Sequence, residues 1–351
     1  MAKQVIIVTG CSGRVGMASI AKLNDPQYVI YGFDIIESKI TQSNFTFMHV
    51  DLTSDESVQE AMESVRKKQG DNIASIIHLA AYYSFSGGSW DMYDKLTIQG
   101  TRRMLDAAQR FKTEQFVFSS TMLVHAPCKI GAKITEESPL IMNWNYPRSK
   151  VLTEELIHSD HGNIPYVVLR IAGCYDDDCH SIPIANEIQR IYEHQLEARL
   201  FPGNIQAGAP FLHLEDLANC ISLCIQKRKG LPKETTLLIG EETRLSYDEL
   251  QREISTCIDG KPIVTHRIPK TIAKCGAWLQ NRLPGFKKGF IQPWMIDIAD
   301  ANYDLDITKA KTLLQWEPKH AIGKTIPIMI KKLLADPKKW YHDNGLTGPS
   351  S

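Results

Sequence analysis

The chain has 351 residues, of which 43% are hydrophobic and 23% are charged. This length allows a sizeable core and indicates two domains or one large α/β domain with a substrate lobe. Forty basic and forty acidic residues balance to zero, which argues against a nucleic-acid or membrane-surface role resting on overall charge. No apolar run reaches the length of a membrane span, the first strand leaves no room for a signal peptide, and the eight cysteines form no Cys-x-x-Cys framework. We therefore expect a cytoplasmic protein with reduced thiols.

The first predicted element is a β-branched strand from Val5 to Val8, which leads into a glycine-rich turn at residues 9–16 and an apolar stretch at 17–23. Gly10 permits a sharp turn, Gly13 lets the backbone approach a pyrophosphate, and Gly16 lets helix and strand pack closely. The loop is thus expected to bind a dinucleotide, with the binding residues Gly10, Ser12, Gly13, Arg14, Val15 and Gly16.

A second predicted strand, 28–33, ends in an acid, Asp34. A carboxylate at this point meets the adenosine ribose hydroxyls and repels a 2′-phosphate, so NAD is favoured over NADP. Arg14 is the opposing observation, because an arginine in the glycine turn accepts a phosphate.

Strands and helices alternate along the rest of the first half. We expect strands at 46–50, 74–79, 115–119, 166–170 and 235–239, and helices from 54 or 55 to 69, from 90 to 111 and from 146 onward. This pattern predicts an α/β fold with a doubly wound parallel sheet of about seven strands and a smaller mixed C-terminal lobe. The NAD-binding domain is assigned to residues 1–171 with 211–240, the substrate-binding lobe to 172–210 with 241–335, and a tail to 336–351.

Tyr146 and Lys150 stand four residues apart on a predicted helix, and Thr121 lies at the carboxyl end of a predicted strand. Residues at i and i+4 share one face, so the ammonium of Lys150 can lie beside the phenol and favour phenolate. Such a tyrosine acts as base or acid toward an alcohol. The spacing alone also fits an ordinary solvated pair, and the glycine loop upstream decides in favour of chemistry.

Together with Asp51-Leu52, His78-Leu79-Ala80-Ala81 and Ser119-Ser120-Thr121, these motifs resemble the extended short-chain dehydrogenase/reductase family, the NAD-dependent epimerase/dehydratase group, over residues 4 to about 335. The resemblance implies that Thr121 orients the reacting hydroxyl, Tyr146 exchanges its proton and Lys150 binds the ribose. It implies a homodimer through helices around 91–111 and 146–161. It also implies a cofactor site that includes Asp51, Leu52, Leu79, Ala80, Ala81, Ser119, Tyr146 and Lys150, although strand-end hydroxyls such as that of Ser119 often satisfy local backbone groups.

Several positions depart from the family pattern. Met122 and Leu123 replace the acidic pair of dehydratases, which disfavours dehydration. Gly173 replaces an asparagine, and Ala209 and Gln292 stand where arginines are often found, which weakens the case for a nucleotide diphosphate. We name as candidate substrate contacts Ser84, His125, Gly173 and His213. No metal is expected, because the spacing of Cys174, Cys179 and His180 fits no standard zinc pattern.

The sequence therefore predicts NAD-dependent hydride transfer at a secondary alcohol. The first expectation is an epimerase acting on a sugar or sugar nucleotide. The second is a dehydrogenase or carbonyl reductase acting on a hydroxylated small molecule, and the third is a dinucleotide-sensing protein without turnover.

Overall fold

The computed structural model describes residues 3–84, 88–282 and 293–348 of the chain. Seven parallel strands form the central sheet in the order β13-β8-β7-β5-β1-β2-β3. Their bounds are β1 (Gln4–Thr9), β2 (Tyr28–Asp34), β3 (Phe45–His49), β5 (Ser75–His78), β7 (Phe116–Thr121), β8 (Tyr166–Ile171) and β13 (Glu234–Ile239). The predicted doubly wound sheet is confirmed. Strand order reverses between β1 and β5, and ligands of such sheets bind outside the carboxyl ends of the strands at this point.

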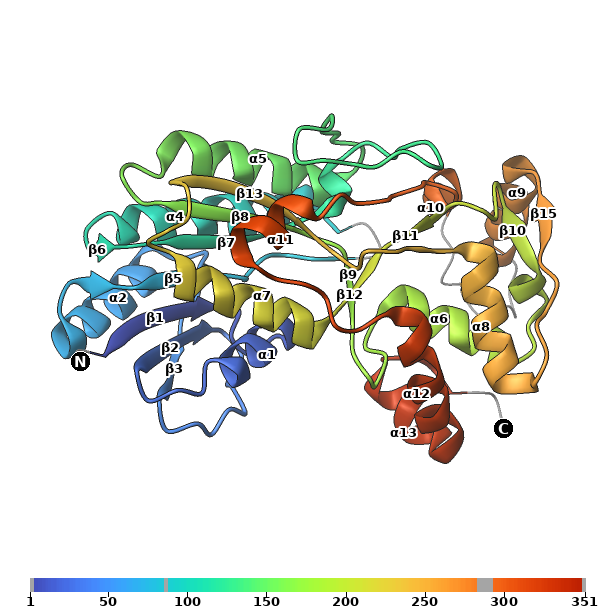
Figure 1. The fold of residues 1–351 in the computed structure, drawn as a ribbon, viewed down its shortest axis with the longest axis horizontal. Coiled ribbons are helices and arrows are strands. Elements are labelled where there is room, and N and C mark those ends of the chain that lie inside the picture. The colour runs from blue at the N-terminus through green and yellow to red at the C-terminus, as the bar shows by residue number, and fades with distance from the viewer. Residues whose placement is uncertain (1–2, 85–87, 283–292, 349–351) are drawn as a thin grey trace.

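Helices cover both faces of the sheet, which is why its strands are apolar on both sides. One face is covered by α2 (Asp55–Gln69), α4 (Gln99–Ala108) and α5 (Asn145–Asp160). The other face is covered by α1 (Arg14–Lys22), α7 (Leu214–Lys227) and α11 (Thr308–Leu314). Figure 1 shows these two helical layers on either side of the strands.

The helix boundaries follow local capping chemistry. The Ser54 side chain accepts a hydrogen bond from the backbone N–H of Ser57, and two acids occupy the first turn of α2. Gly70 ends the helix with a φ of 78°, a conformation that glycine adopts without strain. A cap of this kind stabilises a helix by about 1 kcal/mol. The predicted start of α2 at Ser54 or Asp55 is confirmed.

The helix predicted at 90–111 is divided into three parts. They are α3 (Trp90–Met92), the π-helix η1 (Tyr93–Ile98) and α4. Side chains satisfy two carbonyls of η1, because Thr101 donates to Thr97 O at 2.6 Å and Arg103 donates to Lys95 O at 3.4 Å. The wider turn was not predicted, since it depends on these side-chain bonds rather than on periodicity.

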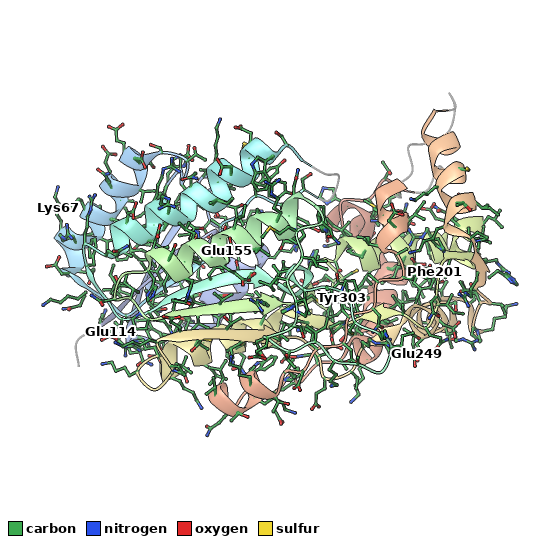
Figure 2. All side chains as sticks on the ribbon, turned by 90° about the horizontal axis from the view of Figure 1, so that it is seen from above. Lys67, Glu114, Glu155, Phe201, Glu249 and Tyr303 are labelled. Carbon is green, nitrogen blue, oxygen red and sulfur yellow. The ribbon has the colours of Figure 1, made fainter. Side chains whose placement is uncertain are left out.

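A smaller lobe lies beyond the carboxyl ends of the strands (Figure 1). Its own core is formed around α6 (Ile182–Tyr192), α8 (Tyr247–Asp259), α12 (Ile322–Ala335) and α13 (Pro337–Asp343). It also contains α9 (Lys270–Arg282), α10 (Pro293–Ile298), and the strand pairs β10 (Leu200–Pro202) with β15 (His266–Ile268) and β11 (Gly208–Ala209) with β14 (Leu245–Ser246). Viewed from above, Phe201 and Glu249 of the lobe lie at the opposite end of the molecule from Lys67 and Glu114 (Figure 2).

Two segments connect the lobe to the sheet. The parallel pair β9 (Gly173–Tyr175) and β12 (Phe211–His213) leads out of β8 and into α7. Residues 303–316 pack with the core of the sheet, where Trp316 donates its indole N–H to the carbonyl of Asp216 at 3.0 Å. The domain division drawn from the sequence stays a proposal. It assigned residues 303–316 to the substrate-binding lobe, whereas in the structure they pack with the core of the sheet. In the tail, Trp340 and Tyr341 are buried in the lobe core.

Candidate functional site

The turn between β1 and α1 excludes side chains at two glycines. Gly10 has a φ of 69°, and a Cβ there would lie 2.9 Å from the backbone nitrogen of Ala80. A Cβ on Gly16 would lie 2.3 Å from the carbonyl oxygen of Gly10. The close packing of turn, strand and helix that the sequence predicts is therefore present.

The N-terminus of α1 is open to an anionic ligand. Its N-cap is Gly13 in an extended conformation, and no side chain caps the helix. The first N–H groups of a helix have no intrahelical partner, so those that follow Gly13 remain for an acceptor, and the helix dipole favours negative charge there. Predicted binding residues Ser12, Arg14 and Val15 flank this point. The arrangement fits the pyrophosphate of a dinucleotide.

Asp34 ends β2 and lies over this turn. One of its carboxylate oxygens accepts a hydrogen bond from Ser12 N at 3.0 Å, and the other accepts from Ile36 N at 3.1 Å. Arg14 lies in different surroundings, because its guanidinium donates to Asp343 O at 3.4 Å. Burial raises the pKa of Asp176, but His180 and, to a smaller extent, the charge of Arg14 lower it, and the net shift is downward. The acid, not the arginine, is held at the turn, which supports the reading of NAD over NADP.

The remaining predicted cofactor segments pack beside the turn. Leu79 and Ala80 each donate a backbone N–H to Thr9 Oγ1 at 3.2 Å, and Ala81 follows them. Val50 N donates to the backbone carbonyl of Asp34 at 3.0 Å, which brings Asp51 and the buried Leu52 to the end of β2. These contacts gather the predicted residues at the carboxyl ends of β1, β2, β3 and β5.

The three predicted catalytic residues meet at the junction of β7 and α5. Thr121 is the last residue of β7, and its hydroxyl acts to lower the pKa of the phenol of Tyr146 in the first turn of α5. Thr121 Oγ1 also accepts from Leu123 N at 3.3 Å, which leaves its own hydrogen for donation. Lys150, one turn further, lies with its Nζ 6.0 Å from the ring centroid of Tyr146 and donates to Ser119 O at 2.7 Å.

The electrostatics of this group differ from the sequence-based expectation. Burial raises the pKa of Tyr146 to about 12, and the hydrogen bond from Thr121 opposes this rise. Burial also lowers the pKa of Lys150 to about 7, with Glu154 opposing the fall. The expected acidification of the phenol by Lys150 is therefore wrong, because burial raises the pKa of Tyr146 and the amine is itself only partly charged at neutral pH.

Aromatic side chains surround the phenol. The ring of Tyr83 meets that of Tyr146 edge to face at 4.8 Å, and the ring of Trp144 lies at 5.6 Å. Tyr83 is 47% exposed and Tyr146 is partly exposed, so this aromatic group borders solvent. Predicted contact Ser84 lies next to Tyr83, and its backbone N–H donates to the hydroxyl of Tyr93 at 3.3 Å.

His125 is removed from the candidate substrate residues. Its Nδ1 lies 3.1 Å from Ser138 O and its Nε2 lies 3.0 Å from Arg170 Nη1, so the protein occupies both ring nitrogens. Burial lowers its pKa to about 4, and the charge of Arg170 adds to that effect. A fully buried neutral histidine with both nitrogens engaged has no means of exchanging a proton with substrate.

Gly173 and His213 also serve the packing of the chain. A Cβ on Gly173 would lie 3.2 Å from the ring of Phe211, so a larger residue would displace that ring. His213 caps α7 by accepting the N–H of Glu215 at its Nδ1, at 3.2 Å. Its other nitrogen faces Asp177 Oδ1 at 3.7 Å in a cavity of about 360 Å³, whose lining also includes Arg14 and Lys332. The contact of either residue with substrate stays a prediction.

One group in the described ranges offers metal-ligand atoms. Atoms of His213, Glu215 and His320 lie within 4.8 Å of one another. Since Nδ1 of His213 accepts a backbone N–H, the neutral ring carries its proton on Nε2 and has no lone pair there for a metal. In the segment around Cys179, His180 pairs with Asp176 at 2.6 Å. The contacts of His213 and of His180 are therefore explained by local structure, without a metal ion.

Sequence reasoning named His78 only as part of a motif, and it missed the buried contacts by which His78 and Glu154 support the site. His78 bridges Thr9 and Thr101, with both distances 2.9 Å, and ties β1 to α4. Glu154 pairs with Arg170 beneath Lys150. The only sequence signal for Glu154 was its position four residues after Lys150, which places both on one face of α5.

Comparison with known proteins identifies the family and the fold. The model of the NAD dependent epimerase/dehydratase family matches residues 6–240, more than half of the chain. The chain belongs to this family. It is an NAD-dependent enzyme of the extended short-chain dehydrogenase/reductase type, and the predicted family, fold class and cofactor are confirmed.

Proteins similar to this chain have several different activities. The chain is 22% identical over 349 residues to a sterol-4-alpha-carboxylate 3-dehydrogenase of Saccharomyces cerevisiae, and the match covers 92% of this chain and 95% of that protein. A Candida albicans protein of the same name is 26% identical over 186 residues, 49% of this chain and about half (51%) of that protein. Among solved structures, dTDP-glucose 4,6-dehydratase of Bacillus anthracis in complex with NAD aligns with a TM-score of 0.70 at 20% identity, covering 97% and 99% of the two chains. UDP-glucuronic acid 4-epimerase of Bacillus cereus, in complex with UDP-glucuronic acid and NAD, aligns at 0.69 and 21%, covering 94% and 100%.

Among the helices in the ranges that the structure describes, none is both long and apolar enough to pass through a bilayer.

Proposed function

We propose that the enzyme transfers hydride reversibly between NAD and a secondary alcohol, with Thr121, Tyr146 and Lys150 as its catalytic residues. The observation that carries this proposal is the contact between α5 and the carboxyl end of β7. Lys150 Nζ donates to Ser119 O at 2.7 Å, two residues before Thr121, and lies 6.0 Å from the ring centroid of Tyr146. Three cofactor features lie at the same edge of the sheet: the open N-terminus of α1, the carboxylate of Asp34 and the backbone at Leu79–Ala80.

NAD, when bound, would supply the hydride acceptor and a positively charged ring. Thr121 donates its free hydroxyl hydrogen and orients the substrate oxygen, while Tyr146 takes or returns the proton on that oxygen. Lys150 stabilises the phenolate of Tyr146 when its own amine is protonated. Because burial holds the pKa of Tyr146 near 12, proton transfer requires positive charge that stabilises the phenolate.

The first candidate reaction is epimerisation of a sugar or sugar nucleotide, in which the ketone turns over before hydride returns. Solved structures of similar fold include epimerases crystallised with UDP-glucuronic acid or UDP-glucose. Dehydration is disfavoured, because Met122 and Leu123 follow Thr121 directly and Met122 is buried, so no acid stands there to eliminate water.

The second candidate is a dehydrogenase or carbonyl reductase that acts on a less polar hydroxylated molecule. Gly173 packs on the Phe211 ring and Ala209 forms β11, so neither position offers a cation or an amide side chain to a diphosphate. Gln292 lies outside the described residues. The aromatic group of Tyr83, Trp144 and Tyr146 favours a substrate with an apolar face. The sterol dehydrogenases among the relatives are consistent with this alternative.

One assay separates the candidates. The NAD-loaded enzyme is incubated with UDP-sugars and, separately, with sterol-like alcohols, and both NADH absorbance and product configuration are followed. Isomer exchange without net NADH supports the epimerase, whereas NADH accumulation supports the dehydrogenase. If NAD binds but Tyr146→Phe matches the wild type with every substrate, the catalytic proposal fails and the hypothesis of a dinucleotide sensor gains.

The assembly and location are also proposals. A homodimer through η1, α4 and α5 is our expectation, and light scattering of the purified protein tests it. A cytoplasmic location is consistent with eight free thiols in the structure. Fractionation of the source cells tests the location. A small-molecule substrate remains the expected partner.

A further inference from the structure

A buried carboxylate lies one helical turn beyond Lys150. Glu154 and its partner Arg170 are 8% and 6% exposed. Arg170 donates from Nη2 to one oxygen of Glu154 at 2.7 Å, and from Nε to both oxygens at 3.2 and 3.3 Å. Ser120 donates its hydroxyl to the same carboxylate. A carboxylate that accepts this many hydrogen bonds, three of them from one guanidinium, is fixed in place.

Two consecutive residues at the end of β7 are bound to α5. The carbonyl of Ser119 accepts a hydrogen bond from Lys150 at 2.7 Å, and the hydroxyl of Ser120 donates to Glu154. Glu154 therefore holds β7 between Ser119, which binds Lys150, and Thr121, which ends the strand. Arg170 extends this connection to the neighbouring strand β8.

The charge of Glu154 acts on an amine with few other favourable neighbours. Lys150 is 2% exposed, and its Nζ lies 4.7 Å from the centroid of the Phe118 ring. His78 on β5 is neutral near pH 7, since burial lowers its pKa to about 3. Burial lowers the pKa of Lys150, and Glu154 is the group that raises it. The titratable and charged groups around the amine are Tyr146 and Glu154 on α5, His78 on β5 and, through Glu154, Arg170 on β8.

We propose that Glu154 is a positioning residue for hydride transfer, which keeps Lys150 protonated by its charge and holds the end of β7 against α5 by its bonds. The role of Glu154 in catalysis rests on the proposed function. It assigns a role to the buried ion pair of Glu154 and Arg170.

The test compares Glu154→Gln with Ser120→Ala in the full-length protein. The glutamine keeps the size of the side chain and removes its charge, whereas the alanine removes one hydrogen bond and leaves the charge. The proton loss of Lys150 is followed by NMR of its ¹³Cε and ¹⁵Nζ nuclei without cofactor, and the pH profile of activity is measured with NAD and substrate.

Glu154→Gln is expected to lower the pH at which Lys150 loses its proton by about one unit, a tenfold fall in proton affinity, and to move the alkaline limb of activity down with it. Ser120→Ala is expected to leave the titration of Lys150 in place. An unmoved titration in folded Glu154→Gln, or an equal shift in Ser120→Ala, overturns the charge role.

Because Arg170 would lose its charged partner, Glu154→Gln is at risk of unfolding, and the double variant Glu154→Gln/Arg170→Met then takes its place. Lys150 should still lose its proton at lower pH in the double variant, and an unchanged titration there contradicts the proposal. The titration of Lys150 can shift as expected while the wild-type enzyme oxidises none of the alcohols tested. In that case the inference on Lys150 stands and the proposed function fails.

Discussion

Replacing Lys150 with methionine should make the folded protein more stable at neutral pH while it disables the chemistry. The amine is buried, and its pKa is lowered from the usual 10.5 to about 7. The unfolded chain binds the same proton with ordinary affinity. Between these two pH values the unfolded state therefore holds more protons, so the free energy of unfolding rises with pH through that window and is lowest below it.

The size of the effect follows from the two affinities. At about pH 7 the difference in proton binding destabilises the wild type by roughly 4 kcal/mol relative to a protein with no charge to bury. Methionine fills a similar volume, but it leaves the carbonyl of Ser119 without its 2.7 Å donor, which costs about 1 kcal/mol. We expect a net gain of about 3 kcal/mol at about pH 7 that disappears near pH 10.

This change in stability is measured by urea unfolding at about pH 7 and about pH 10. The proteins compared are the wild type, Lys150→Met and Lys67→Met. Lys67 is exposed on α2, so its replacement is the control for loss of a surface charge. Equal or lower stability of Lys150→Met at neutral pH, or a gap that does not change with pH, would refute the reasoning. In the same variant we expect activity only at higher pH, because the phenolate has lost its cation.

Three further outcomes are expected. Asp34→Ala should relax discrimination against NADP, and unchanged cofactor preference in steady-state kinetics would count against the placement of that carboxylate. Gly16→Ala should weaken NADH binding measured by fluorescence or unfold the protein, since its Cβ would lie 2.3 Å from Gly10 O, and wild-type affinity and stability would show that the turn adapts. Burial raises the pKa of Glu241 from 4.5 to about 7, so the free energy of unfolding should fall as pH rises between these values. Glu241→Gln should flatten this dependence, and an identical slope in the two proteins would exclude Glu241 as its source.

The sequence was most informative where a local pattern is sufficient. The apolar strands and the capped start of α2 depend on periodicity and on one or two neighbouring residues, and the structure has them where they were predicted. The position of Asp34 over the turn followed from the parallel order of β1 and β2.

Features that depend on tertiary contacts were not predictable from the pattern. The occupation of both nitrogens of His125 requires Arg170, which is 45 residues away. The rise in the pKa of Tyr146 depends on how deeply the ring is buried, and the sequence gives only its spacing from Lys150. Likewise, the return of residues 303–316 to the sheet core is a long-range packing event with no periodic signal.

The most direct test measures a single turnover in wild-type enzyme and Tyr146→Phe, each loaded with NAD and mixed with a substrate found by the assay above. Phenylalanine keeps the ring and removes only the proton-transferring hydroxyl. We predict that hydride transfer slows by about 100-fold or more while the dissociation constant of NAD stays within a few-fold. Transfer at the wild-type rate in the variant would contradict the account.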